Sequence, residues 1–236
     1  MKRSPKRRTE LDRILTEIVE ENRQEALNRR QVWEHLWRRD PEGGCTKSTG
    51  HYVRLSSTKR WPVLDVASGS GRFLKLRDKD SWYVGIDVAW EAVKIGAGRN
   101  KGSDYVQADA AYLPFREGAF EKAFSFHGID FIGQYAPKAV GELARVVRKG
   151  GDILFTVHHT DLLIGKGREF VELGHGKLFG VHNPLYLDGV FAIDRDGLDV
   201  LLEEAGVKDS GTMMWAKKSG QGVPVLSSVL VKAVKR

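Results

Sequence analysis

The chain has 236 residues, of which 41% are hydrophobic and 29% are charged, a composition typical of a soluble globular protein and long enough for one α/β domain. A single cysteine, Cys45, excludes an internal disulfide framework and fits a reducing compartment. No apolar run approaches the roughly 20 residues that a membrane span needs, and no signal-peptide core follows the basic start, so we expect a cytoplasmic protein.

The first sixty residues, 1–60, are predicted to form a basic arm followed by a helical cap segment. Residues 1–8 hold five lysines and arginines, and the whole chain has a formal net charge of +7. Such an arm can bind phosphate groups without sequence preference, although a solubilising terminus explains the same charge. From Thr9 to Arg39, apolar residues recur at spacings of three and four with no proline or glycine. This spacing predicts one long helix or two with a bend.

A glycine-containing turn follows the first predicted strand. Residues 63–66 are apolar apart from Asp65 and lead into Ala67-Ser68-Gly69-Ser70-Gly71. Gly69 and Gly71 can adopt positive φ and let a ligand approach the backbone. A helix that begins near Arg72 would direct free N–H groups at that ligand. The pattern predicts a ligand site at the carboxyl edge of an open α/β sheet, although such turns also serve purely structural connections.

Two further predicted strands also end in a carboxylate. Residues 84–87 end in Asp87 and residues 105–109 end in Asp109. Asp87 follows the turn by about 20 residues, a position from which an acid can accept both hydroxyls of a ribose. The structural alternative is that Asp87 caps the helix predicted over residues 90–98. Three successive strands therefore present a carboxylate at the same edge of the predicted sheet.

In this order, the motifs resemble those of the class I S-adenosylmethionine (SAM) dependent methyltransferases, most closely the type 11 group. That family reads V-L-D-x-G-x-G-x-G, G-x-D, D-A-x-x-L-P-F, F-D and E-x-x-R-V-L-K-P-G-G. The chain carries the counterparts Val63 to Gly71, Gly85 to Asp87, Asp109 to Phe115, Phe120-Glu121 and Glu142 to Gly151. It departs from the family at Ala67 for the first glycine, Glu121 for aspartate and Lys149 for proline.

A nicotinamide or flavin dinucleotide site is the competing interpretation of the glycine turn. Such a site needs a third glycine where Leu74 stands. In addition, Asp65 at the mouth of the turn would repel a pyrophosphate but attract the ammonium group of a methionine moiety. The residues therefore favour SAM.

The resemblance implies a single-domain, Rossmann-like α/β fold. It would have a seven-stranded, mostly parallel sheet with an antiparallel last strand, helices on both faces and an extra N-terminal helix. We expect the SAM-binding domain to span residues 61–236. Its further elements are predicted strands at 120–126 and 152–158, helices at 138–147 and 194–205, and a closing antiparallel pair at 207–215 and 223–234. A glycine-rich insertion at about 160–193 is too long for a simple connection and is predicted to be a lid or acceptor-recognition loop.

The resemblance also implies SAM as the cofactor, S-adenosylhomocysteine as the product, and roles for individual residues. Asp65 is expected to face the methionine ammonium, Asp87 the ribose hydroxyls, and Asp109 the amino group of adenine. The other expected cofactor contacts belong to the glycine turn, to the surroundings of the adenine and to the end of the fourth strand: Ala67, Ser68, Gly69, Gly71, Val88, Ala110, Leu113 and Phe126.

Three histidines are the candidate catalytic residues. His127 follows the fourth predicted strand, and His158 and His159 end the fifth. Because these strands are neighbours in this fold, the imidazoles can gather beside the cofactor methyl group. An imidazole titrates near neutral pH, which suits a general base for a hydroxyl, an amine or an acidic carbon. Each histidine could equally be a hydrogen-bonded residue at a strand end.

A small-molecule O, N or C acceptor is the favoured substrate. Ser125-Phe126-His127-Gly128 stands where adenine-amino and glutamine-amide methyltransferases carry an Asn-Pro-Pro-Tyr-like sequence. Cys45 precedes the core of the fold, which argues against the covalent cysteine route to 5-methylpyrimidines. Cysteines and histidines do not cluster at metal-ligand spacing, so no metal is expected. The alternatives are an RNA (tRNA or rRNA) methyltransferase that uses the basic arm, and a non-catalytic SAM-binding partner subunit. The sequence predicts no oligomeric state.

Overall fold

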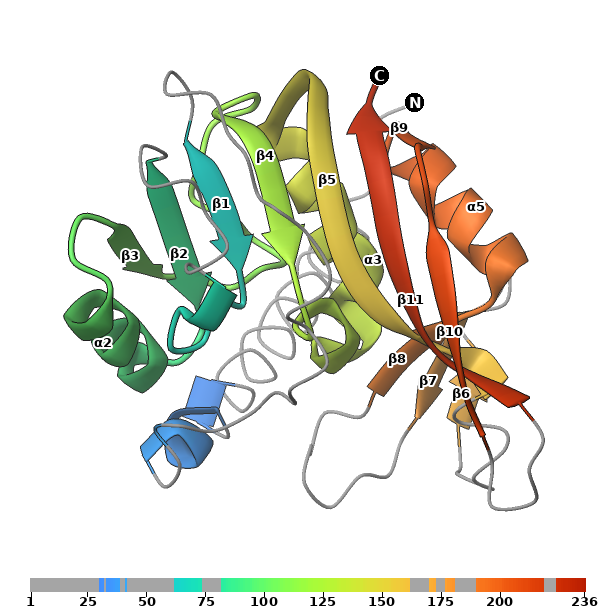
Figure 1. The fold of residues 1–236 in the computed structure, drawn as a ribbon, viewed down its shortest axis with the longest axis horizontal. Coiled ribbons are helices and arrows are strands. Elements are labelled where there is room, and N and C mark those ends of the chain that lie inside the picture. The colour runs from blue at the N-terminus through green and yellow to red at the C-terminus, as the bar shows by residue number, and fades with distance from the viewer. Residues whose placement is uncertain are drawn as a thin grey trace, which may run out of the picture.

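A single sheet runs through the described part of the chain, with helices on both of its faces (Figure 1). This computed structural model describes residues 30–31, 33–38, 41, 62–73, 82–161, 170–172, 177–180, 190–218 and 224–236. Among the helices in these ranges, none has the length and apolar character that crossing a membrane requires.

Five parallel strands form the first half of the sheet. β1 pairs with β2 and β4, β2 pairs with β3, and β4 pairs with β5. In spatial order they are β3 (Asp104–Gln107), β2 (Tyr83–Asp87), β1 (Val63–Val66), β4 (Phe120–Ser125) and β5 (Val147–His159). All residues of β1 and β2 are buried, as expected where helices cover both faces of a parallel sheet.

Antiparallel strands close the other side of the sheet. β11 (Pro224–Lys235) runs antiparallel to β5 and also pairs with β9 (Val207–Asp209) and β10 (Met213–Lys218). β9 and β10 act as one outer strand that is interrupted at residues 210–212. There, the side chain of Asp209 accepts hydrogen bonds from the N–H groups of Gly211 and Thr212 at 2.8 and 2.9 Å. The predicted Rossmann-like sheet with an antiparallel last strand is confirmed, but the strand predicted over 207–215 is broken.

Three additional strands extend the sheet at the end of β5. β6 (Phe170–Glu172), β7 (Lys177–Gly180) and β8 (Val190–Ile193) are antiparallel neighbours, and β8 runs parallel to the last two residues of β5. They belong to the insertion predicted at 160–193, so part of that insertion is anchored on β5 as sheet. Its remaining segments, 162–169, 173–176 and 181–189, lie outside the described residues, and its role as a lid stays a prediction.

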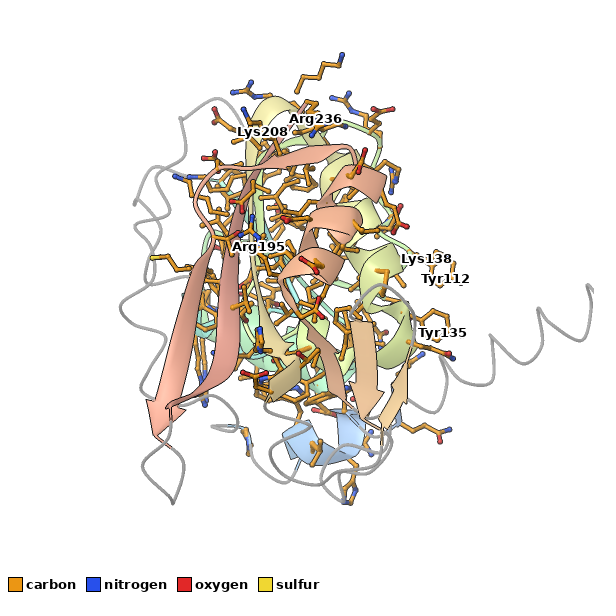
Figure 2. All side chains as sticks on the ribbon, turned by 90° about the vertical axis from the view of Figure 1, so that its right-hand side faces the viewer. Tyr112, Tyr135, Lys138, Arg195, Lys208 and Arg236 are labelled. Atoms are coloured by element: carbon orange, nitrogen blue, oxygen red, sulfur yellow. The ribbon has the colours of Figure 1, made fainter. Side chains whose placement is uncertain are left out.

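The helices predicted after the second, fourth and fifth strands are confirmed, with ends shifted by at most a few residues. They are α2 (Trp90–Arg99), α3 (Ala136–Val146) and α5 (Arg195–Glu204), and two short 3₁₀ turns, η3 (Ile129–Phe131) and η4 (Gly133–Tyr135), precede α3. α5 begins at Asp194, whose side chain accepts the N–H of Gly197 at 2.8 Å, and Gly206 with φ of 66° follows its end. Figure 2 shows Lys138 of α3 beside Tyr112, and its ammonium lies 3.3 Å from the centre of that ring.

Two apolar clusters cover the two faces of the sheet. The larger one joins Leu64 and Val66 of β1 to α3 and α5, and the smaller one joins Val63 to the rings of Tyr83 and Phe124. Because side chains alternate along a strand, Asp65 points to the same face as Val63. The first predicted site carboxylate therefore lies among the aromatic residues of the smaller cluster.

The ring of Tyr105 fits against glycines on α2 and β2, and this packing gives a stability prediction. A Cβ at Gly96 would overlap the Tyr105 ring, whereas a Cβ at Gly98, in the same helix, would meet no atom within 4 Å. We expect Gly96→Ala to lower the free energy of unfolding by about 1–2 kcal/mol, because overpacking outweighs the gain in helix propensity. The control Gly98→Ala should raise it by up to about 1 kcal/mol. Urea denaturation of both variants checks this, and equal effects would contradict it.

Candidate functional site

The turn after β1 has the backbone conformation that its glycines indicate. Gly69 and Gly71 have φ of 52° and 73°, and the N–H of Gly71 donates to the carbonyl of Ser68 at 2.9 Å. Ala67 also has a positive φ, of 57°, which is uncommon for a residue with a Cβ. Gly128, which follows β4, leaves room for the Ala67 methyl group, since a Cβ at position 128 would lie 2.5 Å from it. The departure from glycine at position 67 is thus accommodated by a glycine elsewhere.

Asp65 is a buried carboxylate whose two oxygens have different surroundings. It is 1% exposed, and its Oδ2 accepts a hydrogen bond from the hydroxyl of Tyr83 on β2. Its Oδ1 has no hydrogen-bond partner within the described residues. Burial raises the pKa of Asp65 well above its usual range; the Tyr83 hydrogen bond lowers it, and the nearby charge of Asp87 raises it further. A cationic ligand group would relieve this cost.

Asp87 ties the end of β2 to the glycine turn. Its Oδ2 accepts the N–H of Gly69 and its Oδ1 accepts the N–H of Ala89, both at 2.9 Å. Burial raises the pKa of Asp87 to about 6, against the two backbone hydrogen bonds, and the charge of Glu34 raises it slightly more. The alternative that Asp87 caps α2 is wrong, because the N-cap residue is Ala89 and Glu34 accepts the first N–H groups of the helix.

A helical segment near the N-terminus, residues 30–31 and 33–38, contacts the start of α2 and the glycine turn. The carboxylate of Glu34 accepts the N–H groups of Trp90 and Glu91 at 2.7 and 3.0 Å. The indole of Trp37 packs on the glycine turn, where a Cβ at Gly69 would lie 2.6 Å from the ring. The sequence analysis predicted a helix here, but counted its tryptophans only as apolar positions of that helix and predicted no contact with the glycine turn. The signal that could have indicated these contacts is an acid, Glu34, between two tryptophans four residues apart.

The segment after Asp109 is held by an ion pair on α3. Glu142 accepts the N–H of Leu113 at 2.7 Å, while the Arg145 guanidinium donates to the carbonyls of Leu113 and Phe115 at 2.9 and 2.7 Å. The two side chains also bond each other, at 2.6 and 2.8 Å, and the Arg145 guanidinium lowers the pKa of Glu142. The E-x-x-R motif therefore acts as a clamp on the D-A-x-x-L-P-F motif, a role that the sequence analysis did not predict.

The other predicted cofactor residues lie around this edge in varied surroundings. Asp109 accepts the N–H of Ala111 at 2.9 Å, and Ala110 and Leu113 are buried. Val88 is half-buried and its carbonyl accepts a hydrogen bond from Gln107. Phe126 is 3% exposed and packs on other aromatic rings, Phe73 and Phe124, with centroids 5.1 and 5.2 Å away. Their predicted contacts with the cofactor stay predictions.

Two of the three predicted catalytic histidines lie around one buried acid. Asp130 of η3 is 1% exposed, and its Oδ2 lies 3.2 Å from Nε2 of His158. Burial raises the pKa of Asp130 to about 7, and the charge of His127 acts against that rise. His127 has φ of 54°, and its N–H donates to Thr156 Oγ1 at 2.7 Å. Asp130 was missed in the sequence, although an acid inside the apolar run Gly128-Ile129-Asp130-Phe131-Ile132 is a visible signal.

His159 is separate from this group. It follows His158 on β5 and so points to the opposite face of the sheet. Its Nδ1 accepts the N–H of Asp161 at 3.2 Å and lies 3.4 Å from the Asp161 carboxylate. The expected gathering of all three imidazoles is therefore limited to His127 and His158 within the described structure.

Aromatic rings link the histidine end of β5 to the N-terminal helical segment. Phe131 makes edge contacts with His158 and with Trp33, at centroid distances of 5.9 and 6.1 Å. Within the described ranges, no three His, Cys, Asp or Glu side chains come together as a metal site would require. The site therefore has two parts. One is a cradle formed by the glycine turn with the buried carboxylates Asp65 and Asp87, and the other is the aromatic surface of Phe131 with the imidazole of His158.

Comparison with known proteins relates this region to one family. Residues 64–155 match the sequence profile of a family described as "Methyltransferase domain". The chain is 34% identical over 97 residues to tRNA (carboxymethyluridine(34)-5-O)-methyltransferase of Arabidopsis thaliana, covering 40% of this chain and 23% of that protein. It is 31% identical over 126 residues to 2-phytyl-1,4-naphtoquinone methyltransferase of Synechocystis sp., covering 46% and 52%. The chain thus spans about half or less of the length of these curated relatives.

The fold is shared with solved structures at low sequence identity. A SAM-dependent methyltransferase of Methanosarcina mazei superposes with a TM-score of 0.58 at 19% identity, covering 76% of this chain and 94% of that one. At this identity the likeness shows the fold, and the motifs of residues 64–155 carry the family relation.

Proposed function

We propose that this chain, which carries a class I SAM-dependent methyltransferase domain of the type 11 group, transfers the sulfonium methyl of SAM to a small-molecule oxygen, nitrogen or carbon acceptor by in-line displacement. The observation that carries the proposal is the pair of buried carboxylates around the glycine turn. Asp65 and Asp87 are 1% and 6% exposed, and each has a raised pKa. Such costly groups are typical of a ligand site.

The residues present fit SAM. The Oδ1 of Asp65, which has no hydrogen-bond partner among the described residues, would accept from the methionine ammonium. Asp87 would accept from the ribose hydroxyls, and the clamped segment that begins at Asp109 would hold the adenine. When bound, SAM supplies a methyl group on a sulfonium, which is already a good electrophile. The chain then has to align the acceptor, exclude water and, for a protonated acceptor, accept a proton.

A small-molecule acceptor is supported by the surroundings of His158. Its side chain is only 19% exposed, and Phe131, which also contacts Trp33, lies beside it. Aromatic side chains of this kind are typical of small-molecule sites. The exposed cations Lys208 and Arg236 lie near the amino end of β5, because Val234 of β11 pairs with Asp152 whereas Ser228 pairs with His158 (Figure 2). These two charges are therefore remote from the candidate site.

RNA is the second candidate acceptor. Several relatives are named as tRNA methyltransferases, and the basic arm at residues 1–8, outside the described residues, would suit a nucleic acid. Near the cradle, Arg30 and Arg38 each lie within ion-pair distance of an acid, Glu34 at 3.8 Å and Glu91 at 3.4 Å. Phosphate binding by these two arginines would have to compete with those contacts.

Two measurements test the proposal. Calorimetry should detect binding of SAM and S-adenosylhomocysteine, and absence of binding to either would refute it. Methyl-labelled SAM should then be offered to a small-molecule extract and, separately, to total RNA from cells that express the protein. Label in the small-molecule fraction supports the proposal. Label in RNA with a steep salt dependence supports the alternative, and binding without transfer to either supports a non-catalytic partner subunit.

The clamp on α3 gives a prediction about cofactor affinity. We expect Arg145→Lys to weaken S-adenosylhomocysteine binding by about tenfold, because the three N–H donors of one ammonium nitrogen cannot replace the four bonds that the planar guanidinium makes to the two carbonyls and to Glu142. Arg195→Lys is the matched control, since Arg195 forms exposed ion pairs with Asp199 and Asp209. Calorimetry on both variants decides, and equal affinities would show that the clamp does not shape the adenine side of the site.

A further inference from the structure

We propose that Asp130 is a positioning residue that holds His158 as the proton acceptor of methyl transfer. This confines the substrates to acceptors whose nucleophilic atom carries a proton: hydroxyls, primary or secondary amines, or acidic carbons. The inference rests on the proposed methyltransferase function and deepens it. It adds a residue that the family motifs do not include and narrows the class of substrate.

The geometry of the pair supports this role. Asp130 Oδ2 lies 3.2 Å from His158 Nε2, within reach of a hydrogen bond. Asp130 sits in η3, where the N–H of Phe131 donates to the carbonyl of Gly128 at 3.0 Å and Ile129 is fully buried in the larger cluster. The carboxylate is therefore held on a fixed element, while the imidazole keeps part of its surface exposed.

Burying the Asp130 carboxylate costs stability, which indicates that Asp130 has a role besides stabilising the fold. Its Oδ1 has no hydrogen-bond partner in the described structure, although the residue is 1% exposed. A buried carboxylate that is incompletely paired is destabilising, and an apolar residue or an asparagine would fill the same place at lower cost. Its pKa of about 7 agrees with this cost. Carboxylates held under such conditions are concentrated at sites of proton transfer.

The same observations select His158 among the three candidate histidines. His159 is on the other face of β5 and is engaged with Asp161. His127 contributes a charge that acts on Asp130, so it is the second titrating group facing the pair, from the end of β4. His158 lies 3.2 Å from the buried acid and has a partly exposed ring that contacts Phe131.

The proton and electron balance follows from this arrangement. The lone pair of the acceptor atom forms a bond to the methyl carbon, and the carbon–sulfur bond breaks with its electrons remaining on sulfur, which becomes a neutral thioether. Since Asp130 keeps a proton on Nε2 of His158, the basic nitrogen is Nδ1, and it takes the proton that the acceptor loses. The imidazolium is stabilised by Asp130 and later releases its proton to water. Thioethers and tertiary amines have no proton to lose and gain nothing from this pair.

Nitrogen-detected NMR of the histidine side chains tests the pair directly. In the wild-type protein without added ligand, we expect His158 to be the Nε2–H tautomer, with its signals identified through His158→Gln. In Asp130→Asn, the imidazole pKa should fall by about one unit or more, because the charge that favours the imidazolium is gone. Asp161→Asn, at the acid beside His159 on the other face of β5, is the matched control and should leave the titration of His158 in place.

Each outcome decides the proposal. An Nδ1–H tautomer in the wild type, or a His158 titration that Asp130→Asn leaves unmoved, would overturn it, and the tautomer can be read even if the variant fails to fold. With labelled SAM and whichever extract fraction takes up the label, Asp130→Asn should lower kcat by about 10- to 100-fold with little change in KM. Loss through KM alone would also overturn the proposal. Failure to bind SAM would refute the methyltransferase function but leave the NMR result standing.

Discussion

Asp87→Asn is expected to weaken SAM binding by roughly 100-fold, the largest effect of any single change at the candidate site. Two ribose hydroxyls that donate to a buried carboxylate form charge-assisted hydrogen bonds, each contributing about 1.5–3 kcal/mol. An amide offers one acceptor oxygen, and the Gly69 and Ala89 N–H groups already occupy both oxygens of Asp87. The variant therefore loses both charge and acceptor capacity. Calorimetric titration with SAM measures the change.

The same substitution should remove a pH dependence of stability. Because folding raises the pKa of Asp87 from 3.8 to about 6, the folded state holds a proton that the unfolded state releases between these values. The extra proton binding of the folded state at Asp87 therefore adds to the free energy of unfolding below about pH 4, and this contribution is lost as the pH rises through 6. From pH 7 to pH 5, the wild type should therefore gain about 1 kcal/mol relative to Asp87→Asn. SAM affinity of the wild type should fall over the same range, as the carboxylate protonates.

Asp104→Asn, at an exposed carboxylate on the neighbouring strand β3, is the control for the binding measurement. It should leave SAM affinity unchanged. If Asp87→Asn binds SAM like the wild type, the ribose role of Asp87 is wrong. If binding is lost but the pH profiles coincide, Asp87 contacts the ligand without the raised pKa that burial gives it.

Local patterns in the sequence were sufficient for the strands and the turn at the candidate site. The apolar run that ends at Val66, the glycines at 69 and 71 and the spacing to Asp87 depend on residues close together in the chain, and the structure has the predicted strand, turn and strand there. The helix starting at Asp194 was likewise visible from its capping residue and from Gly206 at its end. The roles of these residues toward SAM came from the resemblance and stay predictions.

Contacts between distant segments were not visible in the sequence. Asp130 and His158 come together because β4, which Asp130 follows, pairs with β5, which carries His158. Glu34 bonds the start of α2 although 56 residues of chain separate them. Neither contact can be predicted from the spacing of residues along the chain. The strands β6 to β8 were also missed, because each is only three or four residues long and glycine-rich sequence between them conceals the alternation. Tertiary packing, not local propensity, decides these features.

Gly128→Ala is expected to lower the free energy of unfolding by about 2–3 kcal/mol, since the new methyl group would be overpacked on several sides. It would lie 2.5 Å from the Cβ of Ala67, 2.6 Å from Oγ of Ser125 and 3.3 Å from the carbonyl oxygen of Val66. Urea denaturation measures the loss. Gly141→Ala, in α3, is the control, because a Cβ there meets no atom within 4 Å, and it should be neutral or stabilising by up to about 1 kcal/mol.

The crowding at position 128 comes partly from the alanine that replaces the family's first glycine, so the two positions should be coupled. Ala67→Gly alone should stabilise the protein by about 0.5–1 kcal/mol, because φ of 57° suits glycine. In the Ala67→Gly background, Gly128→Ala should lower the free energy of unfolding by about 1 kcal/mol less than it does in the wild type. The remaining loss comes from the contact of the new methyl group with Ser125. Additive effects would show that the Ala67 methyl group does not press on position 128. Coupling would explain in physical terms how this chain accommodates an alanine in a left-handed turn beside its cofactor cradle.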